Sequence, residues 1–161
     1  MVRKSPTQVI TRTRSVKATI MVVDDDSMFR DLLSFGLERE GYGVVTATNG
    51  ADAASILEKT RPDVIIVDMM MPVMDGLRFL EWLKDKARLD IPTLLLTCLD
   101  DRALFVEALV AGAADVILKP VSLEVLLEKL SSILGGEMGA DTCGEAEDRE
   151  EAREPDLATE L

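Results

Sequence analysis

Residues 62–76 read PDVIIVDMMMPVMDG, and this stretch decides the fold. Its letters VIIV, at residues 64–67, are apolar and β-branched at every position, and the turn-forming residues Pro72 and Gly76 follow. A strand without polar positions is buried on both faces, which is typical of a parallel sheet enclosed by helices. The stretch therefore predicts a central strand of a parallel sheet, with Asp68 directly after it.

Four further runs of β-branched or aliphatic residues occur, and a stretch of helix length follows each of the five. The predicted strands are residues 19–23, 43–46, 64–67, 93–97 and 115–118. The predicted helices are residues 28–40, 51–59, 77–86, 101–111 and 122–134. Strands that alternate with helices predict a doubly wound α/β fold. We expect a flavodoxin-like, five-stranded parallel sheet in the order 2-1-3-4-5, with helices on both faces.

The last predicted helix carries its apolar side chains on one stripe. The stripe comprises Leu123, Leu126, Leu127, Leu130, Ile133 and Leu134. This spacing indicates that one face of the helix packs on the sheet. Ser122 suits the N-cap position of the helix, and Gly135 suits its C-terminal cap.

The two ends of the chain differ in composition from the middle. Residues 1–17 contain five basic residues and no acid, which predicts a flexible basic arm. Residues 136–161 are rich in glycine and acids, which predicts an acidic, disordered tail. The folded domain is predicted at residues 18–135. Since a chain of 161 residues is too short for two ordinary domains, we expect no attached output domain.

Composition also limits the function and the location. The formal net charge of −12 argues against direct DNA or RNA binding, because an acidic surface repels a polyanion. No apolar run approaches the ~18 residues of a membrane helix, and the basic start lacks the apolar stretch of a signal peptide. We therefore expect a cytoplasmic protein without membrane insertion. Cys98 and Cys143 lie far apart, so neither a disulfide framework nor a zinc site is predicted.

Acidic residues follow two of the predicted strands. Asp24, Asp25 and Asp26 come directly after the first strand, and Asp68 comes after the third. In this fold the carboxyl ends of parallel strands meet at one edge, so we expect these carboxylates to converge. Two carboxylates ~4 Å apart repel by about 4 kcal/mol near a protein surface, so the cluster either protonates or recruits a cation. Oxygen ligands at a small open site favour Mg²⁺, and a carboxylate can attack phosphorus as a nucleophile.

Thr97 and Lys119 end the fourth and fifth predicted strands. A hydroxyl can hydrogen-bond a phosphoryl oxygen, and an ammonium can neutralise developing charge. The set that is complete for phosphoryl transfer is therefore Asp24, Asp25, Asp68, Thr97 and Lys119. Each of these residues alone has a structural explanation as a turn or strand end, and we interpret Asp26 or Ser27 as a helix N-cap. Only their joint occurrence at four strand ends favours the chemistry.

Residues 19–134 resemble the receiver domain of response regulators, the CheY-like family of two-component signalling. The sequence IMVVDD at residues 20–25 is similar to the family's acidic-pair motif, and PDVIIVDMMMPVMDG is similar to its phosphoacceptor motif. Thr97, the pair Gly112 and Ala113, and Lys119 with Pro120 stand at matching spacings.

The resemblance implies that Asp68 accepts a phosphoryl group from a sensor histidine kinase or from a phosphotransfer protein. It also implies that Thr97 and Lys119 contact the phosphoryl oxygens. The bond between Lys119 and Pro120 is expected to be cis.

The cofactor that the resemblance implies is Mg²⁺. Its direct ligands would be Asp25, Asp68 and the backbone carbonyl of Met70. Asp24 would act through water.

Three positions depart from the family pattern. Val116 stands where a tyrosine or phenylalanine usually swings inward on activation, and a valine is too short and too stiff for that movement. Cys98 replaces a small residue beside the threonine, and Val121 replaces a phenylalanine after the proline. We expect the phosphorylation chemistry to survive these changes and the transmission of the signal to be altered.

The usual output surface of the family comprises the fourth helix, the fifth strand and the fifth helix. The fourth predicted helix carries apolar residues over more than half its circumference, at Leu104, Phe105, Val106, Leu109 and Val110. One hypothesis is that Phe105 and Val106, beside Val116, belong to an apolar docking patch for a partner protein or for a second copy in a homodimer. The alternative is a well-buried helix.

The predicted function is that of a single-domain response regulator in a phosphorelay, whose phosphorylation at Asp68 switches protein–protein interactions. We expect a phosphoacceptor domain that assists its own phosphotransfer and dephosphorylation, and not an enzyme. One alternative is a phosphatase of the haloacid dehalogenase type with Asp24 as nucleophile, because Asp24 and Asp26 form an Asp-x-Asp after a strand. Another is a constitutive pseudo-receiver, which Val116 favours.

Overall fold

The computed structural model describes residues 15–135. Its centre is one sheet of five parallel strands in the order β2-β1-β3-β4-β5, as predicted. The strands are β1 (Thr19–Val23), β2 (Gly43–Ala47), β3 (Val64–Asp68), β4 (Thr93–Thr97) and β5 (Asp115–Leu118). The central strands β3 and β4 are buried at every position, which confirms the interpretation of the apolar runs.

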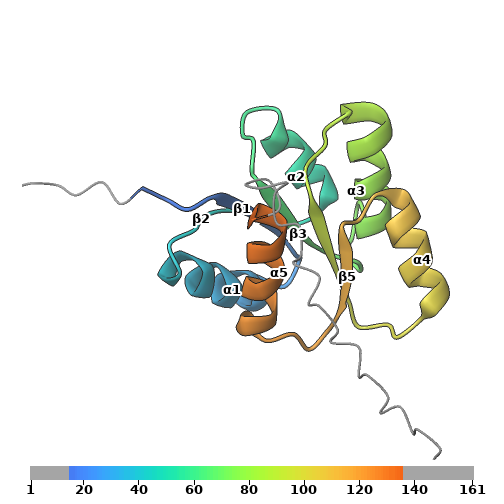
Figure 1. Cartoon of the computed structure of the whole chain (residues 1–161). Helices are drawn as coiled ribbons and strands as arrows, with labels where there is room; N and C mark the ends of the chain where they lie inside the picture. Colours follow the sequence, from blue (N-terminus) through green and yellow to red (C-terminus); the bar gives the residue numbers. More distant parts are fainter. Residues whose placement is uncertain (1–14, 136–161) are drawn as a thin grey trace, which may run out of the picture.

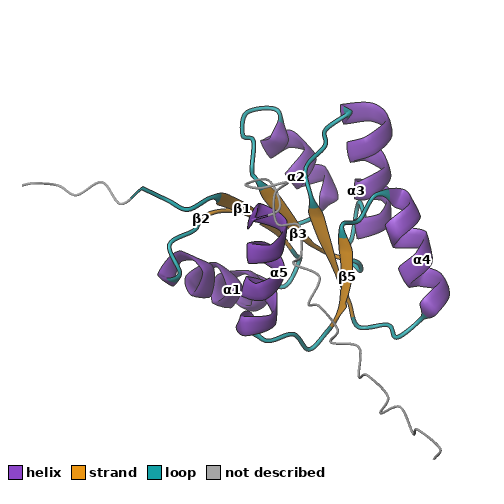
Figure 2. Cartoon of the chain, in the orientation of Figure 1, coloured by secondary structure: helices purple, strands orange, loops and turns teal. Residues whose placement is uncertain are grey.

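Helices cover both faces of the sheet, and Figures 1 and 2 show them in two groups. They are α1 (Ser27–Arg39), α2 (Gly50–Leu57), α3 (Gly76–Glu81), α4 (Arg102–Ala111) and α5 (Leu123–Gly135). Alternate residues of each central strand point to opposite faces. Met21, Ile65 and Leu95 join a core under α2, α3 and α4. Ile20 and Ile66 belong to a second core under α1 and α5.

The leucine stripe of α5 faces the second core. Leu126 and Leu130 are buried there, and the other four predicted stripe residues pack partly buried beside them. The Ser122 hydroxyl accepts a hydrogen bond from the Val125 N–H at 3.3 Å, which confirms the predicted N-cap. Gly135 is the last residue of α5, so the residues that would complete a cap there lie outside the described range.

The third helix differs from its prediction. A single α-helix was expected at residues 77–86, whereas α3 ends at Glu81 and one π-helical stretch, Trp82–Ala87, follows. The wider turn buries Leu83 and ends where the Leu89 N–H donates to the Leu83 carbonyl at 3.0 Å. Apolar spacing over one or two turns does not distinguish a turn of 3.6 residues from a wider one, so the prediction missed this change.

The predicted arm and tail lie mostly outside the described residues. Residues 15–17 are described, and they pack against the end of α1. The Lys17 N–H donates to the Gly41 carbonyl at 2.9 Å, and the Lys17 ammonium lies 5.5 Å from the centre of the Tyr42 ring. In the part of the chain that the structure describes, no helix combines the length and the apolar character needed to cross a membrane.

Candidate functional site

Three carboxylates meet at the edge of the sheet where β1 and β3 end. Asp24, Asp25 and Asp68 each offer an oxygen, and these oxygens lie within 4.8 Å of one another. Asp24 and Asp68 are 2% and 7% exposed, whereas Asp25 is exposed. The predicted convergence is therefore confirmed for these three acids, whereas Asp26 is not part of the cluster.

The turn after β1 holds Asp24 in place. Its side chain accepts a hydrogen bond from the Asp26 N–H at 2.9 Å, and its carbonyl accepts one from the Arg30 guanidinium at 2.6 Å. Asp26 caps α1, because its carboxylate accepts from the N–H groups of Met28 and Phe29. The interpretation of Asp26 as an N-cap is confirmed, so two neighbouring acids have different roles: Asp24 points into the site and Asp26 starts the helix.

Lys119 bridges two of the carboxylates from the end of β5. Its ammonium lies 2.9 Å from Asp24 Oδ2 and 3.0 Å from Asp68 Oδ1. The bond from Lys119 to Pro120 is cis, as expected. Among residues 15–135, no other cationic side chain forms an ion pair with these acids.

Burial and charge shift the pKa values of this pair. Burial raises the pKa of Asp68, the charges of Asp24 and Asp25 add to the rise, and the bond to Lys119 only partly offsets it. Burial by itself lowers the pKa of Lys119, but the hydrogen bonds to Asp24 and Asp68 and the charges of both acids outweigh it, so the net pKa is raised. The lysine therefore stays charged in the site, while a further cation would favour the ionised form of Asp68.

The donor set fits a small divalent cation. Three carboxylates face one ammonium, so an excess of negative charge remains when all are ionised. The Met70 carbonyl, two residues after Asp68, accepts no hydrogen bond from the described residues. Oxygen ligands of this kind are those that Mg²⁺ prefers.

Thr97 lies at the same edge of the sheet, and among the described residues its hydroxyl forms no hydrogen bond with the carboxylates. It is fully buried at the end of β4, one residue beyond Leu96, which pairs with Asp68. Its hydroxyl accepts a hydrogen bond from the Leu99 N–H at 3.1 Å. Within residues 15–135 no hydrogen bond joins it to Asp68, so the structure brings Thr97 to the edge and not into the ion-paired group.

Two residues with a part in this site were not among the predicted site residues. The ring of Phe29, in the first turn of α1, has its centre 4.3 Å from the Lys119 ammonium. Gly76 leaves no room for a side chain, because an added Cβ would lie 2.7 Å from the Asp68 carbonyl oxygen. Two features of the sequence could have indicated these residues: Phe29 is an aromatic residue just after the acidic cluster, and Gly76 is a glycine at the start of a helix.

Residues 20–131 match the family described as "Response regulator receiver domain". The chain belongs to this family. Among curated relatives, the response regulator MprA of Mycolicibacterium vanbaalenii is 38% identical over 127 residues, covering 79% of this chain and 54% of the relative. "Probable transcriptional regulatory protein TcrX" of Mycobacterium tuberculosis is 35% identical, covering 72% of this chain and 49% of the relative. The chain thus spans about half the length of the curated relatives it matches.

Solved structures of receiver domains share the fold of this receiver. The signal receiver domain of a histidine kinase from Syntrophus aciditrophicus superposes with a TM-score of 0.70 at 37% identity, covering 80% of this chain and 98% of that one. The chemotaxis response regulator CheY4 of Vibrio cholerae gives 0.68 at 33% identity, covering 74% of this chain and 99% of that one. This agreement supports the flavodoxin-like topology predicted from the sequence.

The three departures from the family pattern have different surroundings in the receiver. Val116 is half-buried and packs against the core under α4. Cys98, beside Thr97, is exposed and forms no disulfide with any described residue. Val121 lines a groove between α1 and α5.

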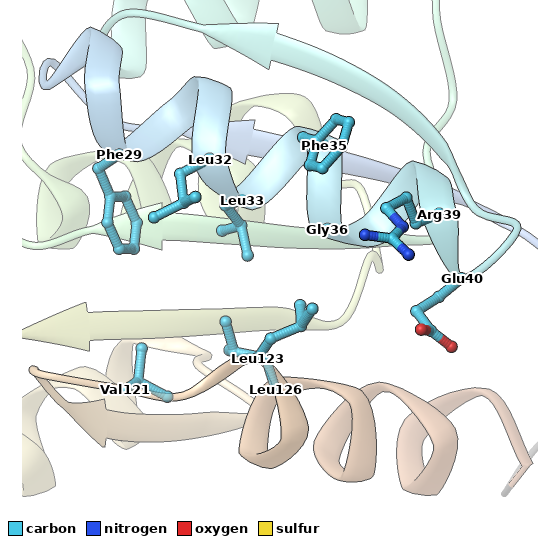
Figure 3. Close-up of a pocket in the computed structure, with 10 residues that line it drawn as sticks. All are labelled: Phe29, Leu32, Leu33, Phe35, Gly36, Arg39, Glu40, Val121, Leu123 and Leu126. Atoms are coloured by element: carbon cyan, nitrogen blue, oxygen red, sulfur yellow. The ribbon is translucent and has the colours of Figure 1, made fainter.

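That groove of the receiver has a volume of about 510 Å³ and is shown in Figure 3. Phe29 and Leu33 of α1 point toward Val121 and Leu123 on the side of α5 (Figure 3). Along the outer side of α1, an apolar stripe is exposed at Met28 (78%), Leu32 (70%) and Phe35 (61%). We call these three residues the α1 stripe.

Helix α4 of the receiver is not well buried. Only Ala108 is buried, Leu104 and Phe105 are half-buried, and Val106, Leu109 and Val110 are exposed. The alternative of a buried helix was therefore wrong. The exposed apolar residues of α4 are Val106, Leu109 and Val110, which we call the α4 stripe. This set keeps Val106 of the hypothesised docking patch and leaves out Phe105.

Proposed function

We propose that this receiver is a phosphorylation switch in which Asp68 accepts a phosphoryl group from a histidine kinase or phosphotransfer protein. The observation that carries the proposal is the position of Asp68, which shares its ammonium partner with Asp24 and lies in reach of Asp25. A nucleophilic carboxylate beside a cation site and a fixed lysine is what phosphoryl transfer to an acid requires.

The reaction would run from a phosphohistidine of the donor protein. A carboxylate oxygen of Asp68 attacks phosphorus, and the phosphorus–nitrogen bond to the donor imidazole breaks. The electron pair stays on that nitrogen, which takes a proton from solvent. Lys119 holds positive charge against the phosphoryl oxygens, and the Thr97 hydroxyl would hydrogen-bond one of them after a shift of the strand end.

Magnesium, held by Asp25, Asp68 and the Met70 carbonyl with Asp24 acting through water, would supply charge neutralisation for the incoming phosphoryl group. The receiver is proposed to assist its own phosphorylation and the later hydrolysis of its acyl phosphate, so it is a phosphoacceptor and not an enzyme with a separate substrate.

A donor helix would dock on the α1 stripe and the adjoining groove. Phe29 connects the groove with the site, because its ring both lines the groove and lies 4.3 Å from the Lys119 ammonium. The stripe repeats at helical spacing, so an amphipathic helix of the donor can lie along it with its phosphohistidine near Asp68.

The output of the switch would use the α4 stripe, with a second copy of the receiver as the occupant. Asp115 and Lys129 form an exposed ion pair at the neighbouring β5 and α5. A two-fold interface is formed by the same surface on both subunits, so a pair of opposite charges on that surface can contact its counterpart on the second copy. Phosphorylation would strengthen the pairing by repacking β4 and α4.

Incubation of the full chain with acetyl phosphate and Mg²⁺ tests the proposed function. Intact-mass measurement should show one added phosphoryl group, and both chelation of Mg²⁺ and Asp68→Asn should remove it. Asp90→Asn is the matched control, because Asp90 is exposed and lies outside the carboxylate cluster. An adduct that persists in Asp68→Asn would contradict the proposal and would favour the phosphatase alternative if it mapped to Asp24.

A further inference from the structure

The Lys119 ammonium has an aromatic neighbour in addition to its two carboxylates. The centre of the Phe29 ring lies 4.3 Å from Lys119 Nζ, whereas Asp24 and Asp68 contribute oxygens at 2.9 and 3.0 Å. The Lys119 side chain is only 17% exposed. Three groups that attract a cation therefore surround one poorly hydrated ammonium.

This contact differs from the other two cation–aromatic contacts in the described residues. Lys17 lies 5.5 Å from the ring centre of Tyr42, and Arg39 lies 5.7 Å from that of Phe35. Both of those cations belong to exposed residues. Attraction between a cation and the face of a ring grows as the pair approaches and loses water, so the contact of Lys119 is the strongest of the three.

The backbone of Phe29 is fixed independently of the lysine. Its N–H donates to the capping carboxylate of Asp26 at 3.3 Å, and α1 packs on the sheet through Leu33 and Leu37. The ring is therefore placed by the start of α1, while Lys119 comes from a distant part of the sequence, directly after β5. A fixed ring can orient a flexible lysine, and the reverse is less effective.

We propose that Phe29 is a positioning residue, whose ring holds the Lys119 ammonium between Asp24 and Asp68 in the place where it meets the incoming phosphoryl group. The proposal rests on the proposed function and adds to it a residue that touches neither the phosphoryl group nor the cation site. When the attraction between the ring and the ammonium is weakened, the Lys119 side chain adopts other rotamers. Its ammonium is then less often in place when the phosphoryl group arrives.

The same ring lines the groove between α1 and α5 (Figure 3). A donor helix in that groove would touch the residue that orients Lys119. The Phe29 side chain would therefore contact the docked donor helix and also orient Lys119.

Graded fluorination of Phe29 tests the proposal. Fluorinated phenylalanines keep the shape of the ring while they withdraw charge from its face, so only the attraction for the ammonium changes. We expect the rate of Asp68 phosphorylation by acetyl phosphate, at saturating Mg²⁺, to fall stepwise with each added fluorine, by about fivefold in total. Phe29→Leu should be phosphorylated as slowly as the most fluorinated form, and Phe29→Tyr, which keeps an aromatic ring, should be phosphorylated at the rate of the unsubstituted protein.

The matched control is the same series of fluorinated phenylalanines at position 42, with Tyr42→Phe as its reference, because the ring there lies 5.5 Å from the Lys17 ammonium and does not line the groove. That series should leave the rate unchanged. NMR gives a readout independent of phosphorylation: the methylene protons of Lys119 next to the ammonium should be shielded by the ring, and Phe29→Leu should remove that shift.

The outcomes distinguish a failure of the positioning role of Phe29 from a failure of the proposed phosphorylation of Asp68. A normal rate across the Phe29 series, in a protein whose Asp68 is phosphorylated, would overturn the positioning role and leave the proposed function standing. Absence of phosphorylation in the unsubstituted protein would overturn the proposed function, and the positioning role would fall with it. A phosphorylation rate that does not fall with fluorination, while the Lys119 methylene protons stay shielded by the ring, would also overturn the positioning role. The contact between Phe29 and Lys119 would then be present without an effect on the rate.

Discussion

At the scale of single residues, Lys119 is the group on which the balance of charge in the site depends. It is the partner of both Asp24 and Asp68, which are almost fully buried. Removing one partner of a buried pair leaves the other charge without compensation, which costs more than the pair itself contributes. The stability of the site without a metal should therefore depend on this one side chain.

The variant Lys119→Met should lower the free energy of unfolding in the absence of Mg²⁺ by about 1–3 kcal/mol, because two buried carboxylates lose their counter-charge. Saturating Mg²⁺ should recover most of the loss. Urea unfolding with and without Mg²⁺ measures both values. Lys129→Met is the control: its ion pair with Asp115 is exposed, so a change of at most ~0.5 kcal/mol is expected. Equal effects of the two substitutions would contradict this account.

Gly76 allows the close approach of α3 to the strand that carries Asp68. An added Cβ would lie 2.7 Å from the Asp68 carbonyl oxygen and 2.7 Å from a methyl group of Leu95. The leucine can move, but the backbone of Asp68 must also shift. Gly76→Ala should therefore cost about 1–3 kcal/mol in urea unfolding and slow phosphorylation by acetyl phosphate.

Gly135→Ala is the control for that substitution, because no atom of the neighbouring described residues lies within 4 Å of a Cβ added there. It should leave stability and phosphorylation unchanged or slightly improve stability. A folded Gly76→Ala protein that is phosphorylated at the normal rate would contradict the prediction, because the displaced backbone of Asp68 would then not impair phosphorylation.

At the scale of helices and strands, the two exposed stripes should have separable roles. Leu32→Glu on the α1 stripe should reduce phosphotransfer from a kinase or phosphotransfer protein at least tenfold, because a charge replaces an apolar contact. Phosphorylation by acetyl phosphate should stay normal, since Leu32 is 70% exposed and outside the site. Val106→Glu on the α4 stripe is the control and should leave both donors unaffected.

The α4 stripe should control self-association instead. Val106→Glu with Val110→Glu should abolish any dimer that forms on phosphorylation, as measured by analytical ultracentrifugation with and without acetyl phosphate. Leu32→Glu should leave that dimer intact. A phosphorylated receiver that stays monomeric, or a dimer that survives both α4 substitutions, would contradict the proposed output surface.

The elements themselves could be predicted with small errors at their ends. Strands β1, β4 and β5 begin and end at the predicted residues. For β1 and β4 the reason is burial at nearly every position, which leaves a continuous apolar run in the sequence. The π-helical stretch Trp82–Ala87, in which Leu83 is buried, was not predicted, because apolar spacing over one or two turns does not distinguish it from an α-helix. The exposure of α4 was not settled either, because a helix with apolar residues on most sides gives no dominant face.

At the scale of the whole molecule, the sheet brings together groups that lie far apart in the chain. Asp24 and Lys119 are separated by 95 positions and still form a hydrogen bond at 2.9 Å. The order of the strands predicts that these residues share an edge. It does not predict which side chains pair across that edge, because pairing depends on rotamers and on the tilt of α1. For this reason the members of the site were predicted, while the bridge from Lys119 to Asp24 and the contact with Phe29 were not.

The central claim is that Asp68 itself carries the phosphoryl group, and site mapping tests it most directly. The phosphorylated chain is treated with borohydride, which reduces an aspartyl phosphate to homoserine, and the digested peptides are sequenced by mass spectrometry. The account predicts homoserine at position 68 only, and only in samples that contained Mg²⁺. Homoserine at position 24 or 25, or an unmodified Asp68 in a protein that gained the mass of a phosphoryl group, would contradict it.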